Sequence, residues 1–339
     1  MPISKLKKDD LKFINRINNF KIWDEVLKKS NHSYIEYTNY FIDYQISFFN
    51  QNYTCNDLSI ILLLNDKPIA ILPILKKKDY NKTNEIILLE DYILPPLYIL
   101  NLDKNFIEEL NSFFENKIID IFNKYGLNKI KILYYKDSND QFLINYQKNI
   151  ISNEDLSFIY LDLQPNIDII KKSFRKSYKS LINQGNKIFN IKIYSKYDEK
   201  FWEKFQNFHY EISGKKTRSN DTWEIQKKLL INNRAFIVVS YNLDQKMIGA
   251  AFFTHSFHES SYSIGLYKKN YYNLPIGHCI QFHAINEMKR RSIKFYRLGE
   301  FNKKELDFEK NKKLKNIIFF KKGFSSHINV NKLKEFSIK

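Results

Sequence analysis

The sequence is poor in cysteine and has no long apolar run. Its 339 residues include 2 cysteines, Cys55 and Cys279, which are too few for a disulfide framework or a cysteine-based zinc site. No uninterrupted apolar run approaches the roughly 18 residues of a membrane-spanning helix. Residues 1–5 lack the apolar core of a signal peptide. We therefore expect a cytoplasmic protein.

Metal-ligand clusters are also missing from the sequence. His255 and His258 flank a predicted hairpin turn, but no carboxylate or cysteine lies near them at ligand spacing. We interpret both histidines as surface residues and expect no metal site.

The composition is that of a folded, basic protein. Hydrophobic residues make up 43% and aromatic residues 16%, which indicates globular structure, and the length suggests two domains. The net charge is +18, but lysine far outnumbers arginine, and the excess accompanies abundant Ile and Asn along the whole chain. We attribute most of it to composition and expect no DNA partner. What remains is attraction for anionic partners: phosphorylated intermediates, tRNA or the inner membrane surface.

The second half of the chain contains the clearest order of elements. Three apolar runs rich in β-branched and aromatic residues precede a Gly-containing loop, a helix and a short strand. These segments are 236–239, 248–253, 261–266, 271–277, 278–291 and 294–298. Ile280, Ala284 and Met288 recur at helical spacing and predict the buried face of the helix. We expect the last strand to stop at Gly299.

The same order of elements occurs earlier in the chain. Two strands at 59–64 and 69–75 are joined by turn residues, and a helix at 104–124 precedes a strand at 129–134. Gly126 is predicted to end that helix. A repeated order of this kind indicates a duplicated domain. We therefore expect an α/β (α+β) protein with domains at 1–155 and 156–339.

A basic helix is predicted over 166–188, between the two halves. Four residues share its apolar face: Phe174, Tyr178, Leu181 and Ile182. Arg175 and Lys176 lie off that face. They can hold a phosphate or carboxylate group, or form an ordinary solvated surface.

Two further segments of the second half carry predictions. A helix over 199–212 is expected to end at Gly214, and the next loop carries a cluster of cations. Asp221 is placed to cap the following helix. The apolar run at 317–324 is predicted to be the last strand and to end in a basic turn.

Several motifs of the second half belong together. They are Phe208-His209, 214–218, 222–226, 275–278, 281–285, 298–300 and the Phe-Lys-Lys-Gly-Phe sequence at 320–324. With these motifs the chain resembles the FemAB-like or BioF2-like family of the Gcn5-related N-acetyltransferase (GNAT) superfamily. The resemblance covers about residues 155–330, and the first 150 residues only through the repeat.

The resemblance implies two tandem GNAT-like subdomains, each a mixed, mostly antiparallel sheet flanked by helices, the N-terminal one degenerate. It implies transfer of an acyl group, acetyl or similar, from acyl-coenzyme A to an amine of an amino sugar or of a lipid- or nucleotide-linked cell-envelope precursor. One alternative is a FemAB-type aminoacyltransferase that uses aminoacyl-tRNA and acts on a peptidoglycan precursor. The long helical arm of FemAB proteins is not visible here. A second alternative is a non-catalytic binding module.

Candidate site residues follow from this chemistry and from the resemblance. An amine attacking an activated carbonyl needs a base, and Glu300, His209 and His278 are the candidates. The residues expected to hold substrate are Arg175, Lys176, Lys216, Arg218, Trp223, Tyr262, Gln281, Lys321 and Lys322. The loop before the helix at 278–291 matches the phosphate-cradling signature of coenzyme A users only at one glycine, so Gly277 and His278 are the candidates there.

Overall fold

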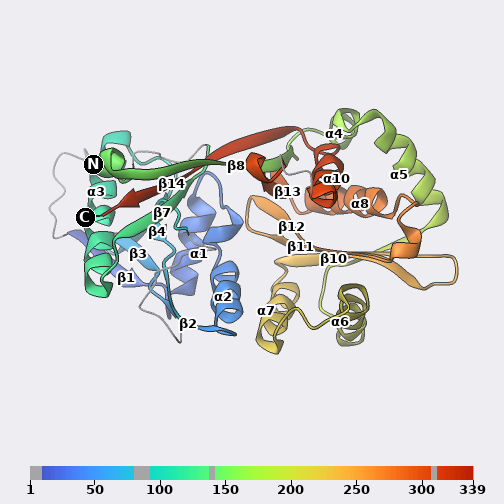
Figure 1. The fold of residues 1–339 in the computed structure, drawn as a ribbon, viewed down its shortest axis with the longest axis horizontal. Coiled ribbons are helices and arrows are strands. Elements are labelled where there is room, and N and C mark those ends of the chain that lie inside the picture. The colour runs from blue at the N-terminus through green and yellow to red at the C-terminus, as the bar shows by residue number, and fades with distance from the viewer. Residues whose placement is uncertain (1–9, 80–91, 137–141, 307–310, 339) are drawn as a thin grey trace. The chain divides into compact units, whose positions relative to one another are not determined.

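The computed structural model describes residues 10–79, 92–136, 142–306 and 311–338 (Figure 1). The chain forms two compact units. Unit 1 comprises Met1–Leu156 and Val330–Lys339, and unit 2 comprises Ser157–Asn329. The predicted C-terminal domain, 156–339, includes the last ten residues, whereas these belong to unit 1 in the structure. Residues 1–5, examined above for a signal peptide, lie outside the described residues.

Unit 1 contains the first of the predicted hairpins. Its strands are β1 Leu11–Asn15, β2 Tyr53–Asp57, β3 Ile60–Leu64, β4 Lys67–Leu72, β5 Leu75–Asp79, β6 Leu97–Tyr98 and β7 Lys129–Tyr134. Its helices are α1 Phe20–Lys29, α2 Asn39–Phe49, α3 Lys104–Tyr125 and the 3-10 segments η3 Ile35–Tyr37 and η4 Ile144–Asn149. Asn65 and Asp66 both have positive φ in the β3–β4 turn, as a tight hairpin requires. Gly126, at φ 70°, ends α3 as predicted.

Unit 2 follows the order predicted for the second half. Its strands are β9 Asn190–Tyr194, β10 Ala235–Tyr241, β11 Met247–His255, β12 Glu259–Tyr267 and β13 Phe295–Asn302. Its helices are α4 Ile167–Ser173, α5 Lys176–Ile188, α6 Glu199–Ser213, α7 Asn220–Ile231, η5 Lys269–Tyr271, α8 Ile276–Arg290, α9 Lys303–Leu306 and α10 Lys312–Lys322. Strands β8 Ile150–Asp162 and β14 His327–Ser337 carry the chain across the unit boundary.

The sheet of unit 2 is covered on both faces. Alternate residues of its strands point to opposite sides, so neighbours in the sequence enter different cores. On one side Phe253 joins a core with α8, whose Ile280, Ala284 and Met288 are fully buried as predicted. On the other side Phe252 lies 6.2 Å from the Phe205 ring of α6. Figure 1 shows α5, α8 and α10 on one side of β10–β12, and α6 and α7 on the other.

The predicted last strand at 317–324 is wrong, because this segment is helical. Helix α10 covers Lys312–Lys322, buries Ile318 and leaves Phe319 64% exposed. A short apolar run does not distinguish a strand from a helix by periodicity, and here the four apolar residues spread around one helical turn. The last strand of the chain is β14, which pairs antiparallel with β7.

Three local predictions also need correction. The helix predicted over 166–188 is broken at Phe174, and the Arg175 amide donates to the Gly323 carbonyl (2.8 Å) instead of continuing the helix. Helix α7 is capped by the Ser219 side chain, which accepts from the Thr222 amide, so Asp221 lies in the first turn. Gly299 lies inside β13 and does not end it.

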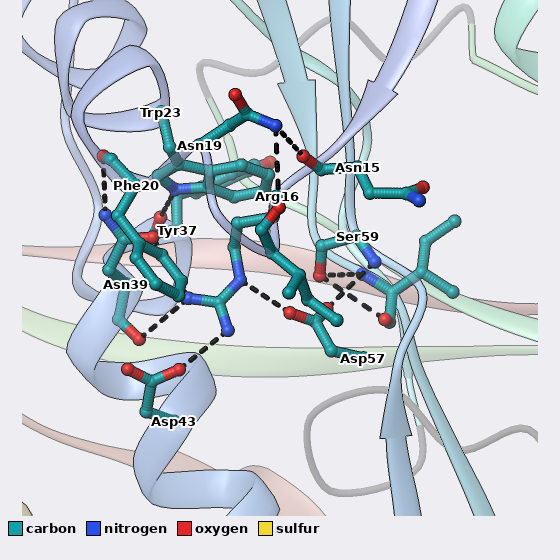
Figure 2. Close-up of polar contacts among 12 residues, drawn as sticks. Asn15, Arg16, Asn19, Phe20, Trp23, Tyr37, Asn39, Asp43, Asp57 and Ser59 are labelled. Atoms are coloured by element: carbon teal, nitrogen blue, oxygen red, sulfur yellow. Dashed lines mark hydrogen bonds and ion pairs between the residues drawn. The ribbon is translucent and has the colours of Figure 1, made fainter.

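A buried arginine holds the helices of unit 1 to its strands. Arg16 is 2% exposed, and its Nε donates to Asp57 Oδ2 at 2.8 Å. Its Nη2 donates to Asp43 Oδ1 at 2.6 Å, and its Nη1 donates to Asn39 Oδ1 at 3.0 Å. Figure 2 shows the guanidinium directed at these three side chains. One residue that follows β1 therefore links strand β2 and helix α2.

Replacing Arg16 should destabilise unit 1 strongly. Arg16→Met leaves the nearly buried Asp57 carboxylate without its counter-charge, which we expect to lower the free energy of unfolding by about 3–5 kcal/mol. Asp43→Asn, at a carboxylate 44% exposed, should cost about 1 kcal/mol or less. Urea unfolding followed by Trp23 fluorescence, in a Trp202→Phe/Trp223→Phe background, measures both. Equal losses in the two variants would contradict this account.

Candidate functional site

Two parallel strands of unit 2 separate after a short ladder. Strands β12 and β13 pair only over Glu259–Ser261 and Phe295–Arg297, although both continue to Tyr267 and Asn302. Both strands lie wholly in the described part of the chain. After Ser261 and Arg297 they form no further pairs with each other. The two strand ends therefore diverge.

Lys321 of α10 lies in this opening. A Cβ at Gly299 of β13 would be 2.3 Å from Lys321 Nζ, so the ammonium group packs directly against the glycine backbone. The same Nζ lies 5.6 Å from the Tyr262 ring of β12. Lys321 thus contacts both of the diverging strands. Gly299 has φ 156°, a conformation that L side chains rarely adopt, and its missing side chain makes room for the lysine.

Glu300 is the neighbouring acid. It is exposed and lies inside β13, because this strand continues past Gly299 to Asn302. Burial lowers the pKa of Lys321, and the negative charge of Glu300 offsets part of this effect. An ammonium group that is partly desolvated and near a carboxylate interacts strongly with nearby charge.

A cluster of tyrosines adjoins Lys321. Tyr262 and Tyr267 are joined through their hydroxyls at 2.8 Å, and Tyr296 donates to Gln281 Oε1 at 2.5 Å. Burial raises the pKa of Tyr262 to about 12. A Cβ at Gly265 would lie 2.0 Å from Tyr262 Oη, so this glycine provides the space for the phenol. The predicted residues Tyr262 and Gln281 therefore belong to one group with Lys321.

A second group surrounds His278 at the start of α8. Its ring makes edge contacts with Tyr178 (4.5 Å between centroids) and Phe320 (5.1 Å). Arg175 donates to Tyr178 Oη at 2.9 Å and to the Phe319 carbonyl at 2.9 Å. Burial and the charge of Arg175 lower the pKa of His278 to about 4. This histidine is therefore neutral near pH 7, but it is held among aromatic rings.

The start of α8 fits a coenzyme A diphosphate poorly. Gly277 is the second residue of this helix, and a Cβ there would lie 3.2 Å from the Phe320 ring. A ring of α10 thus fills the space beside this glycine, so the turn offers no open glycine-lined cradle on that side. No side chain caps α8, and the amides of its first turn are the donors that remain for a phosphate group.

Three other predicted residues lie on the far face of the sheet. His209 of α6 and Trp223 of α7 are buried, with their rings perpendicular and 5.2 Å apart. Arg218 Nη1 lies 2.5 Å from His209 Nε2, and the guanidinium lies 5.5 Å from the Trp223 ring. Burial and Arg218 lower the pKa of His209 to about 4. The structure therefore divides the predicted site residues into groups on two faces.

The remaining predicted lysines are more exposed. Lys176 is exposed at the start of α5, and Lys216 is exposed in the α6–α7 loop, where its Nζ donates to Asn220 Oδ1 at 3.1 Å. Lys322 is half-buried, with its Nζ 4.4 Å from the Phe301 ring centroid. These positions suit long-range attraction of anions better than fixed contacts.

Sequence reasoning missed the roles of Gly299, Tyr267 and Tyr296. Their signal, a glycine and aromatic residues within strands, is also that of ordinary core positions. It also misplaced His255, which is 5% exposed and not on the surface. Its Nδ1 lies 3.0 Å from the Ser256 carbonyl oxygen and its Nε2 2.9 Å from Arg291 Nη1. Burial lowers the pKa of His255 to about 4.

Known structures share this fold. The chain is similar to FemX, with a TM-score of 0.70 and 11% identity, over 93% of this chain and 95% of FemX. It is similar to L-PGS from Bacillus licheniformis (TM-score 0.54, 9% identity, 80% and 82% covered). It is also similar to a tandem GNAT protein of clavulanic acid biosynthesis (TM-score 0.50, 7% identity, 96% and 98% covered). The predicted fold class is confirmed: a mixed α/β protein consistent with two GNAT-like subdomains.

No protein-family model and no curated protein sequence matches the chain. The likeness to solved structures, at 7–11% identity, therefore establishes the fold alone. Within the described residues, every helix is too short or too polar to cross a membrane.

The buried histidines should make stability depend on acid pH. The folded-state pKa values of His209 and His255, about 4, lie below the ordinary value of 6.5. The unfolded chain therefore takes up protons first, so their contribution is complete above about pH 6.5 and is lost as the pH falls towards 4. We expect the free energy of unfolding from urea titrations to decrease over this range. His209→Gln should reduce that pH dependence, and an unchanged slope in this variant would contradict the assignment.

Proposed function

We propose that this chain is an N-acyltransferase that passes an acyl or aminoacyl group from an activated carbonyl donor to an amine. The observation that carries the proposal is the position of Lys321 between the diverging ends of β12 and β13. A fixed ammonium group in a partly dry opening is suited to stabilise the negative charge that develops on an attacked carbonyl oxygen. The likeness to FemX and to GNAT proteins supports the same class of reaction.

Lys321 and Glu300 would have different roles in such a transfer. The donor carbonyl would lie beside Lys321, with its oxygen towards Nζ and the rest of the acyl group between the separated ends of β12 and β13. Glu300 is the candidate to accept the proton that the amine loses when its nitrogen bonds to the carbonyl carbon. The bond from that carbon to the donor's sulfur or oxygen then breaks, and the leaving group takes up a proton.

Two classes of donor remain in view. Acyl-coenzyme A is the donor that the sequence favoured, and aminoacyl-tRNA is the alternative. Phe320 fills the space beside Gly277 where the coenzyme A diphosphate would be expected, which favours aminoacyl-tRNA. The TM-score is also higher with FemX than with the tandem GNAT protein. The acceptor we propose is an amine of an amino sugar or of a cell-envelope precursor, in keeping with a FemAB-like family.

The donor can be decided by measuring both classes with one protein sample. Isothermal titration with acetyl-coenzyme A and coenzyme A reports the first class. Protein-dependent transfer from tRNA charged with labelled amino acids to amine acceptors reports the second. Transfer from either donor supports the proposal, and we expect the tRNA ester to be the better one. Failure to bind or consume either donor would favour the binding-module alternative.

Removing the Lys321 ammonium should abolish most of the transfer. Lys321→Met keeps the apolar stem but removes the charge, and we expect kcat to fall about 10²–10³-fold with little change in donor affinity. Lys315→Met, on the exposed side of the same helix, is the matched control and should retain full activity. An active Lys321→Met variant would remove this residue from the chemistry.

Gly299→Ala tests the position of the Lys321 ammonium without changing the lysine. The added methyl would occupy the position 2.3 Å from Lys321 Nζ and force the ammonium to move. We expect kcat to fall at least tenfold, because displacement by about 1 Å can cost that much or more. Gly126→Ala, where nothing lies within 4 Å of the new methyl, controls for the strain of alanine at positive φ. Equal activity in the two variants would contradict the placement of Lys321.

A further inference from the structure

Three helices of unit 2 have an unusual charge composition. Helices α5 and α10 contain lysines but no Asp or Glu, and α4 contains a single acid, Asp168, in its first turn. The lysines of α5 and α10 therefore have no acidic partner on their own helix. Cations that are not balanced in this way attract anionic partners at long range.

Arg175 joins the start of α5 to the end of α10. Its backbone amide donates to the Gly323 carbonyl at 2.8 Å, and its Nη2 donates to the Phe319 carbonyl at 2.9 Å. Tyr178 of α5 donates to the Phe320 carbonyl at 3.0 Å. The two basic helices are therefore held together, and their cations form one surface.

Two large apolar side chains on these helices face the solvent. Phe319 of α10 is 64% exposed, and Ile169 of α4 is 55% exposed. The guanidinium carbon of Arg175 lies 3.6 Å from the Phe319 ring centroid, so a cation covers one face of this ring. Lys172, one turn after Ile169, and Lys176, next to Arg175, are also exposed. We call these five residues the basic face.

The mixture of cations and exposed apolar side chains is typical of a surface that binds a membrane peripherally. Phe and aliphatic side chains are stabilised at the boundary between headgroups and acyl chains, while Lys and Arg reach the lipid phosphates. RNA also attracts cations, but its contacts with aromatic rings are base stacking. Ile169 cannot stack, and Arg175 already covers one face of Phe319. The basic face therefore fits lipid better than RNA.

We propose that the basic face docks unit 2 on the surface of a membrane that contains anionic lipids. Phe319 and Ile169 enter the boundary between headgroups and acyl chains, and Lys172, Arg175 and Lys176 bind lipid phosphates. This inference goes beyond the proposed transfer reaction, and its test requires neither a donor nor an acceptor.

Sedimentation with vesicles tests the proposal on the full chain. The protein is pelleted with vesicles of phosphatidylcholine alone and with vesicles that contain an equal amount of phosphatidylglycerol. We expect it to pellet with the anionic vesicles only, and added salt should weaken this binding. A protein that stays in solution with anionic vesicles at low salt would overturn the proposal.

Charge reversal shows whether the basic face is responsible. Lys172→Glu/Lys176→Glu should lower the vesicle partition coefficient at least about tenfold. Lys200→Glu/Lys204→Glu makes the same change of net charge at two exposed lysines of α6, on the other side of the sheet, and should retain most of the binding. Far-UV circular dichroism reports whether each variant is folded. Equal losses in the two variants would show attraction by net charge alone and would contradict the assignment to this face.

Insertion of Phe319 has a readout of its own. The native tryptophans Trp23, Trp202 and Trp223 are at most 4% exposed, so Phe319→Trp adds an indole that lipid can reach. Lipids with brominated acyl chains should quench the fluorescence of this variant. Leu243→Trp, at a residue 86% exposed between β10 and β11, is the control and should not be quenched. Equal quenching of the two variants, or of neither, would rule out insertion at Phe319.

A labelled single-stranded RNA distinguishes the other class of polyanion. Its anisotropy is measured with the wild type, with Lys172→Glu/Lys176→Glu and with Phe319→Ala. Loss of vesicle binding in both variants supports the proposal. If both keep vesicle binding and lose RNA binding, the basic face is a nucleic-acid surface and the membrane proposal falls. Neither result depends on Lys321, so the acyltransferase proposal is tested separately.

Discussion

The separation of two parallel strands governs the chemistry proposed for this protein. Strands β12 and β13 start as neighbours, but their ladder ends at Ser261 and Arg297. Beyond that point Gly299 provides the space that Lys321 fills, and Gly265 leaves room for the phenol of Tyr262. A single lysine thus places a positive charge between the separated strands, where we propose that a carbonyl binds.

The two faces of the unit 2 sheet are packed by different helices. The apolar face of α8 packs on the sheet, where Gln281 of this helix accepts from Tyr296. Helix α10 is held to the start of α5 by Arg175, whose side chain donates to the Phe319 carbonyl and whose amide donates to the Gly323 carbonyl. On the opposite face, aromatic packing between α6, α7 and the sheet holds Arg218 against His209. Lys321 lies where burial has removed part of the competing water.

The sequence alone predicted the elements whose residue pattern fits only one type of secondary structure. The face of α8, the turn at Asn65-Asp66 and the glycine ends of α3 and α6 were predicted from spacing and turn chemistry. It failed where two periodicities compete, because the four apolar residues at 317–320 suit a strand as well as a helix. Contacts far apart in sequence were also beyond it. Nothing near Gly299 indicates that Lys321 will pack on it, and nothing near His209 indicates that Arg218 will donate to it.

The most direct test of this account is the structure of the protein with a stable analogue of an acyl donor, such as an amide- or ketone-linked one. The account predicts the carbonyl oxygen of the analogue about 3 Å from Lys321 Nζ, with the acyl group between the separated ends of β12 and β13. An analogue bound elsewhere, with Lys321 still packed on Gly299 and distant from the carbonyl, would contradict the central claim.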